Sequence, residues 1–211
     1  MKLNTKLTVL ILTASAFSCS VLAKTDTLLK VQKDWAACQY QTKDSDKKSK
    51  CFEQVISLNK TDLQQSPDNP NLMVWLAINK ASLAGAEGGL SGLSQAKQAK
   101  KILEQVIEKA PETLNGSAYT SLGSLYYKVP GWPIGFGDDA KAEKLLKKAL
   151  EINPNGIDSN YFYGDFLVEQ GKKKEAIKYL TRAQNAAPRP ERPVADAGRQ
   201  QEISTLLKSL K

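Results

Sequence analysis

The side chains most often used for catalysis are either missing from this sequence or spaced without a pattern. The 211 residues include no histidine, which excludes a Ser-His-Asp or Cys-His centre and removes the commonest zinc ligand. No glycine stretch ends in the Gly-Lys-Ser/Thr of a phosphate loop. The Ser-x-x-Lys spacing of some serine nucleophiles occurs in three unrelated settings, as chance gives in a chain rich in both residues: Ser45/Lys48, Ser57/Lys60 and Ser94/Lys97. We therefore expect no enzymatic activity, no metal site and no cofactor.

Adjacent carboxylates at Asp138 and Asp139 have two readings. A pair of this kind can hold a cation, but here it directly precedes a helical pattern that starts at Ala140. Carboxylates in this position accept the free backbone N–H groups of the first turn and face the positive end of the helix dipole. We expect a helix cap rather than a metal site.

Cys38 and Cys51 flank a polar turn between two stretches with helical spacing of apolar residues. The two sulfurs lie at matched distances from that turn, so they face each other if the stretches form an antiparallel hairpin. In an oxidising compartment this predicts a structural disulfide, worth about 3 kcal/mol for a closed loop of about 14 residues. A redox pair is the alternative, but it would favour a Cys-x-x-Cys spacing.

Residues 1–23 have the layout of an export signal. Lys2 and Lys6 supply its positive end, and the apolar stretch that follows is too short to span a bilayer. Small residues up to Ala23 suit cleavage by a signal peptidase, which would leave a periplasmic or secreted chain. Two alternatives stay open: lipid attachment at Cys19, whose preceding residues fit a lipoprotein cleavage box poorly, and an uncleaved membrane anchor.

Composition predicts a globular protein, with 41% hydrophobic and 25% charged residues. The net charge of +8 comes from lysines spread along the expected helices. Nucleic-acid binding would need a concentrated stripe with arginines or stacking aromatics. We therefore expect no nucleic-acid partner, and no membrane span, because no long apolar run follows the first segment.

One spacing recurs three times along the chain. In each copy a leucine follows an alanine by four positions, an apolar residue follows the leucine by three, and a proline follows that residue by five. The three copies are Ala99–Leu103–Val106–Pro111, Ala142–Leu146–Ala149–Pro154 and Ala176–Leu180–Ala183–Pro188. Small residues let two antiparallel helices pack closely, and proline cannot continue the second helix. A single helix pair leaves its apolar face bare, so repeated pairs must stack to make a core.

These residues carry a resemblance to the tetratricopeptide repeat (TPR) family. The segment 156–188 has the family's signature positions at Gly164, Gly171, Ala176, Leu180, Ala183 and Pro188. A second copy has Gly123 and Tyr126, and a more degenerate copy has Trp75 and Ala77 near the expected places. The resemblance implies an all-α, right-handed solenoid of helix pairs whose first helices line a concave groove.

The expected organisation has three parts after the signal. A disulfide-stapled helical hairpin covers 24–69, and TPR-like repeats cover 70–188. Within that range the repeats are 70–111, 112–154 and 155–188, and a proline-containing linker with a capping helix covers 189–211. Arg189, Arg192 and Arg199 in this last part could form an anion site.

Two repeats carry extra glycine-rich stretches between their helices, at 84–93 and 129–137. Glycine predicts flexible loops, yet Trp132 and Phe136 bring apolar surface into the second one. Either these aromatics fold down and close the core, or they form a lip for a ligand or partner. Looped repeats of this kind also resemble, more weakly, the TatT component associated with TRAP-type solute transporters.

The groove positions follow from the TPR pattern by counting from each crossing glycine or alanine. They are Asn71, Val74, Ile78, Ala81 and Ser82, then Ser117, Thr120, Ser124, Tyr127 and Lys128, then Asp158, Tyr161, Asp165, Val168 and Glu169. The groove would thus grade from apolar to hydroxyl-rich to acidic. The lysine and asparagine clamp that some TPR co-chaperones use for a peptide carboxylate is missing. A basic or amphipathic segment therefore suits the acidic end better than an acidic tail, with a solvated charged face as the alternative.

The sequence thus predicts an exported, non-enzymatic interaction module that grips a protein or peptide of the cell envelope. The alternative is a small-molecule-binding accessory component of a TRAP-type transporter. In that case the glycine loops and Trp132 would enclose a ligand between helices.

Overall fold

The computed structural model describes residues 17–211, with side chains from Thr27 onward, and every regular element in that part of the chain is helical. The all-α stack predicted from the sequence is confirmed. Most of the predicted signal peptide lies outside the described residues, and so does the side chain of Cys19. No helix of the described part is long and apolar enough to cross a lipid bilayer.

The N-terminal hairpin pairs α1 (Phe17–Ala36) with α2 (Ser45–Gln65). One π-helical turn, Ala37–Gln41, extends the first helix, and Asp44 caps the second by accepting the backbone N–H of Lys47. The predicted disulfide is present between Cys38 and Cys51, whose Cα atoms are 5.6 Å apart. It joins the two helices close to their connecting turn.

Three helix pairs follow: α3 (Pro70–Glu87) with α4 (Gly89–Lys109), α5 (Ser117–Lys128) with α6 (Asp139–Ile152), and α7 (Ile157–Glu169) with α8 (Lys173–Gln184). Each pair crosses where the sequence places a small residue. A Cβ added to Gly123 would lie 2.8 Å from Cγ of Leu146, and one added to Gly164 would lie 2.8 Å from Cγ of Leu180. Only glycine permits so close an approach.

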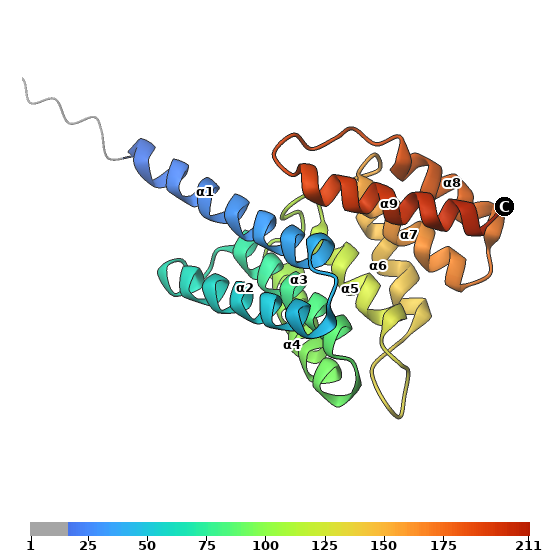
Figure 1. Ribbon diagram of the computed structural model, residues 1–211, viewed down its shortest axis with the longest axis horizontal. Helices are drawn as coiled ribbons and strands as arrows, with labels where there is room; N and C mark the ends of the chain where they lie inside the picture. The colour runs from blue at the N-terminus through green and yellow to red at the C-terminus, as the bar shows by residue number, and fades with distance from the viewer. Residues whose placement is uncertain (1–16) are drawn as a thin grey trace, which may run out of the picture.

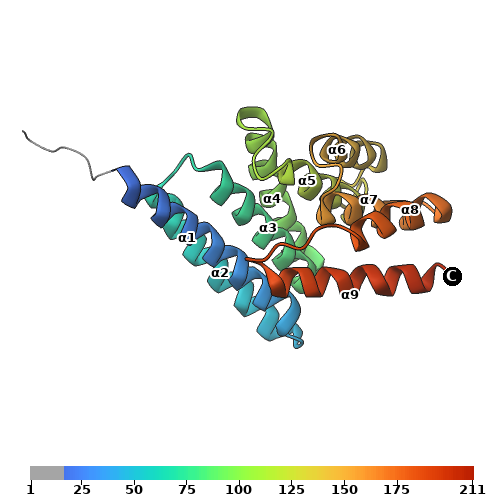
Figure 2. The same cartoon turned by 90° about the horizontal axis from the view of Figure 1, so that it is seen from above.

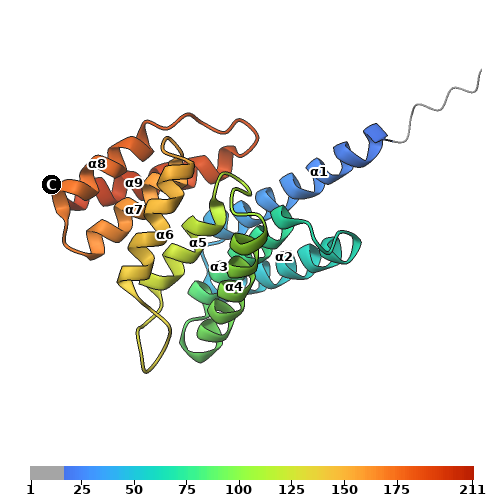
Figure 3. The same cartoon turned by 180° about the vertical axis from the view of Figure 1, so that it is seen from behind.

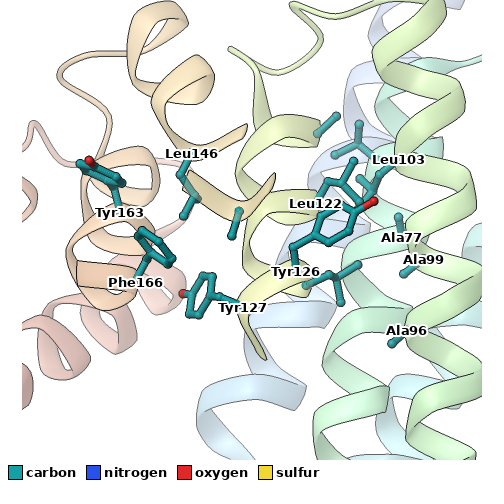
Figure 4. Close-up of a cluster of buried hydrophobic side chains, with 14 of the residues drawn as sticks. Ala77, Ala96, Ala99, Leu103, Leu122, Tyr126, Tyr127, Leu146, Tyr163 and Phe166 are labelled. Carbon is teal, nitrogen blue, oxygen red and sulfur yellow. The ribbon is translucent and has the colours of Figure 1, made fainter. Parts of the chain in front are cut away.

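The pairs stack side by side, so the coloured ribbon passes in chain order from one end of the molecule to the other (Figures 1 and 3). Their shared core runs across α4, α5, α6 and α7 without a break (Figure 4). Leu103, Leu146 and Phe166 are almost completely buried in it. Tyr127 packs edge-on against Phe166 and links the second pair to the third.

The stretch 84–93 is not the flexible loop that its glycines predict. Helix α3 continues to Glu87, α4 starts at Gly89, and the chain reverses at Gly88 with φ of 65°. A Cβ on Gly92 would lie 2.5 Å from the carbonyl oxygen of Ala84, so glycine here serves close helix contact. The other stretch, 129–137, is a loop, and Asp138 caps the following helix as predicted by accepting the N–H of Lys141 at 3.0 Å.

The last helix, α9 (Pro193–Ser209), does more than cap the stack. Ile203 is fully buried against the third pair, with Leu206, Leu207 and Leu210 around it. The same helix also contacts α1 and the π-helical turn at the other end of the molecule. A Cβ on Gly198 would lie 2.3 Å from the ring of Tyr40. Figure 2 shows the start of α9 beside the junction of α1 and α2, so the helix reaches back across the stack.

Candidate functional site

A cavity of about 780 Å³ lies on the concave side of the stack. First helices of the three pairs, α3, α5 and α7, supply most of its wall, as the TPR pattern predicts. The N-terminal hairpin closes one side, and the segment from Ala187 to Glu202 closes another. In Figure 2, α9 lies on one side of these first helices, while α4 and α6 lie on the other.

Ten of the fifteen predicted groove positions line this cavity: Ile78, Ala81, Ser82, Ser117, Thr120, Ser124, Lys128, Asp158, Tyr161 and Asp165. The other five lie elsewhere. Val74 and Tyr127 are buried in the shared core, and Asn71, Val168 and Glu169 are not part of the cavity wall. The counting is thus most accurate on α5, where four of five positions line the cavity, and it fails at the start of α3 and at the end of α7.

One wall of the cavity is aromatic. Trp35 and Trp75 meet edge to face, with ring centroids 5.6 Å apart, and the indole N–H of Trp35 donates to Ser82 Oγ at 2.8 Å. Trp35 comes from the N-terminal hairpin, which the groove pattern does not cover. Its place in the cavity could not be found without knowing that the hairpin packs against α3.

The acidic end of the predicted groove is held by arginines of the C-terminal segment. Asp158 receives Arg189 at 2.6 Å and Arg199 at 3.0 Å. Burial alone would raise the pKa of Asp158, but the guanidinium groups of Arg199 and Arg189 outweigh it and lower this pKa to about 2. Asp158 is thus ionised and paired, and it ties α7 to the segment that closes the cavity.

The same network reaches the N-terminal hairpin. Arg199 also binds Glu202 at 2.6 Å, and the hydroxyl of Tyr40 donates to this carboxylate at 3.3 Å. The guanidinium of Arg199 lies 4.1 Å from the ring centroid of Tyr161, which fixes both side chains at the cavity wall. Burial raises the pKa of Glu202 and of Tyr40, although Arg199 opposes both shifts.

The remaining predicted acids are also paired within the chain. Lys128 forms ion pairs with Asp165, at 2.9 Å, and with Glu169. The hydroxyl of Tyr127 donates to Asp165 at 2.8 Å. The sequence favours a basic partner only if these carboxylates are free. In the structure each of them is paired with a cation of the same chain.

Trp132 and Phe136 lie outside the cavity wall. Phe136 folds down onto Tyr126, with ring centroids 5.6 Å apart. Trp132 is 90% exposed in the loop between α5 and α6, and this loop lies well away from α9 in Figure 1. The two aromatics of this loop therefore have different environments, and neither encloses the concave side.

The turn between α4 and α5 forms part of the cavity rim. Leu114, Asn115 and Gly116 follow one another with φ of 49°, 54° and 74°. This left-handed backbone is unusual for leucine and costs conformational energy, which the surrounding packing must supply. Side chains able to hold a metal ion do not gather here or anywhere else in the described residues.

Comparison with known proteins gives a fold and a family match for the C-terminal part of the chain. Residues 134–197 match the tetratricopeptide repeat family. The structure is similar to that of TTC0263, a thermophilic TPR protein of Thermus thermophilus, with 19% identity over 76% of this chain and 77% of that chain and a TM-score of 0.56. Two crystal structures of MamA align with TM-scores of 0.46: one has 18% identity over 80% of this chain and 93% of that one, the other 17% over 88% and 91%. No curated protein matches the sequence.

Proposed function

Since residues 134–197 match the tetratricopeptide repeat family and the fold is similar to that of a TPR protein, we propose that this chain is a non-enzymatic interaction module of the cell envelope and that its concave cavity takes a segment of a partner protein. Proteins of this family are typically interaction modules. The observation that carries the proposal is the continuous cavity of about 780 Å³ lined by the first helix of every pair.

The cavity wall suits a peptide segment. Its apolar side is formed by the half-buried side chains of Ile78 and Ala81, which lie beside the buried rings of Trp35 and Trp75. Across α5, hydroxyl groups of Ser117, Thr120 and Ser121 offer hydrogen bonds to a peptide backbone. This combination of apolar area and dispersed polar groups is typical of interfaces that bind an extended chain.

The envelope location is part of the proposal and is supported by two features. The first 23 residues have the pattern of an export signal. The disulfide between Cys38 and Cys51 is of a kind that persists in oxidising compartments. The expected result is a mature protein whose N-terminal sequence starts at Lys24, while an N-terminus at Met1 or a lipid-modified Cys19 would contradict this maturation.

A small-molecule accessory role for a TRAP-type transporter is the second candidate. The cavity volume favours it, because about 780 Å³ falls within the range of small-molecule sites, roughly 300–1,000 Å³. The closing helix α9 favours it as well, because its residues Arg199 and Glu202 line the cavity.

The test uses substitutions that fill the cavity. Ser121 lines the cavity on α5, and Lys144 is exposed on the outer helix α6. Ser121→Trp should abolish the capture of a protein partner from an envelope extract, and Lys144→Trp should leave it unchanged, as measured by quantitative mass spectrometry. Equal capture by both variants would overturn the proposed site, and a co-purifying small molecule displaced by Ser121→Trp would favour the transporter role.

A further inference from the structure

The charged groups that line the cavity are nearly all satisfied by one another. Asp158 and Glu202 are bound by arginines, and Asp165 is bound by Lys128. Five cationic side chains and three carboxylates line the wall, and two further carboxylates, Glu169 and Asp196, pair with Lys128 and Arg189 from outside it. Every one of these carboxylates is thus paired, whereas two of the lining cations, Lys48 and Arg192, are not paired in the part of the chain that the structure describes: the full set is Lys48, Lys128, Arg189, Arg192 and Arg199 against Asp158, Asp165 and Glu202. An incoming ligand therefore meets a surface whose unpaired charge is positive.

Two of these cations have no carboxylate partner among the described residues. Lys48 donates to the carbonyl oxygen of Gln39 at 2.9 Å. Arg192 has no hydrogen bond or ion pair from its side chain within the described chain, and its Nε is buried without a partner. Burial and the neighbouring Arg189 lower the pKa of Arg192 to about 10, so the group is still charged at neutral pH.

The position of Arg192 is fixed although its charge is not paired. Its guanidinium lies over the ring of Trp75, 5.0 Å from the centroid. Its backbone N–H donates to the carbonyl of Arg189 at 2.8 Å, and its own carbonyl accepts the N–H of Asp196 at 3.1 Å. Pro193 follows directly and restricts the backbone further. A fixed guanidinium loses little entropy when it binds an anion.

We propose that Arg192 recognises a carboxylate on the ligand of this cavity, while an apolar part of the ligand packs against Ile78 and Ala81 beside Trp75. The planar fork of arginine binds a carboxylate through two parallel hydrogen bonds. Such a ligand would neutralise a half-buried charge that the chain itself leaves unpaired. This inference rests on the proposed use of the cavity as a binding site. It favours an acidic ligand, whereas the groove positions in the sequence favour a basic one.

The experiment measures a preference for acids over amides. The probes are a set of aromatic and aliphatic carboxylic acids and N-acetylated dipeptide acids, each paired with its primary amide, and binding is measured by saturation-transfer NMR. Wild-type protein should bind the acids about tenfold to a hundredfold more tightly than the amides, as expected for one charge-assisted interaction. Arg192→Gln should remove this preference, and Arg192→Lys should keep part of it.

The matched control is Arg182→Gln, because Arg182 lies on the exposed face of α8 and stacks on Tyr179 outside the cavity. It should retain the full preference. Binding of no acid by the wild type, equal binding of acids and amides, or a preference that survives Arg192→Gln would each overturn the proposal. If Arg192→Gln fails to fold, the indole N–H resonances of the wild-type protein provide the test. A bound acid must shift the resonance of Trp75, which lies under Arg192, and leave that of Trp132 unchanged. An unmoved Trp75 resonance overturns the proposal.

The probes also separate the two sources of a carboxylate. Preference for dipeptide acids would assign the ligand to the end of a polypeptide, and preference for the smaller acids would assign it to a solute. Failure here is distinguishable from failure of the proposed function. If a partner protein is captured by the wild type and lost in Ser121→Trp, but acids bind no better than amides, only the role of Arg192 is overturned. If acids bind preferentially but no protein is captured, the protein-binding role is overturned and the role of Arg192 stands.

Discussion

Asp158 illustrates how a single residue can look like a binding group in the sequence and act as a structural one. The TPR pattern places it at the groove, and the structure does place it at the cavity wall. Its carboxylate, however, binds Arg189 and Arg199, which are 31 and 41 residues further along the chain. No local pattern contains these pairings, so the sequence could predict the position of Asp158 but not its partners.

Asp158→Asn should destabilise the protein by about 1–3 kcal/mol, because it leaves two guanidinium groups without their shared carboxylate. The lowered pKa of Asp158 gives this effect a pH dependence. The stabilisation is complete above the unfolded-state pKa, near 4, and is lost as the pH falls through the folded-state pKa, about 2. Urea unfolding of both proteins should therefore show a free-energy difference that is constant from pH 7 to pH 5 and shrinks towards pH 2. A difference that grows on acidification would contradict the assignment.

At the scale of helices, spacing predicted most of what the structure contains. The alanine, leucine and proline repeat identified the second helices, and Ala142, Leu146, Ala176 and Leu180 are all fully buried. Glycine was harder to interpret, because the same residue permits a loop, a close helix crossing or a reversal of the chain. The stretch 84–93 shows the second and third of these uses, and only the packing of α3 against α4 distinguishes them from a loop.

Two glycine-to-alanine substitutions should change stability in opposite directions. Gly164→Ala places a methyl group 2.8 Å from Cγ of Leu180 and should cost about 1–3 kcal/mol through overpacking at the crossing. Gly85 is an exposed helical position with nothing within 4 Å of the new methyl group. Gly85→Ala should therefore stabilise the protein by about 0.5–1 kcal/mol. Thermal unfolding of both variants tests this, and a destabilising Gly85→Ala would mean that the helix does not continue through this residue.

For the molecule as a whole, the feature that the sequence did not predict is closure. A solenoid is open along its groove, and the expected role of the last helix was to cover one end. Here α9 also contacts the N-terminal hairpin, where Tyr40 and Glu202, 162 residues apart, share a hydrogen bond. That contact depends on the combined curvature of all the pairs between them, which no single repeat encodes.

Gly198→Ala should weaken this closure, because the added methyl group would lie 2.3 Å from the ring of Tyr40 and must separate α9 from the hairpin. Hydrogen exchange in the first half of α9 should become about tenfold faster, while exchange in α7 and α8 stays unchanged. Gln201→Ala, at an exposed position of the same helix, is the control and should have no effect. Unchanged exchange in Gly198→Ala would show that α9 does not depend on this contact.

The central claim is that the cavity bounded by α3, α5, α7 and α9 is where the partner binds. A photo-crosslinking amino acid placed in living cells at Ser121, inside the cavity, and separately at Lys144, on the outer face, tests it most directly. We predict a discrete adduct from Ser121 and none from Lys144. An adduct that forms equally from both positions, or only from Lys144, would contradict the claim.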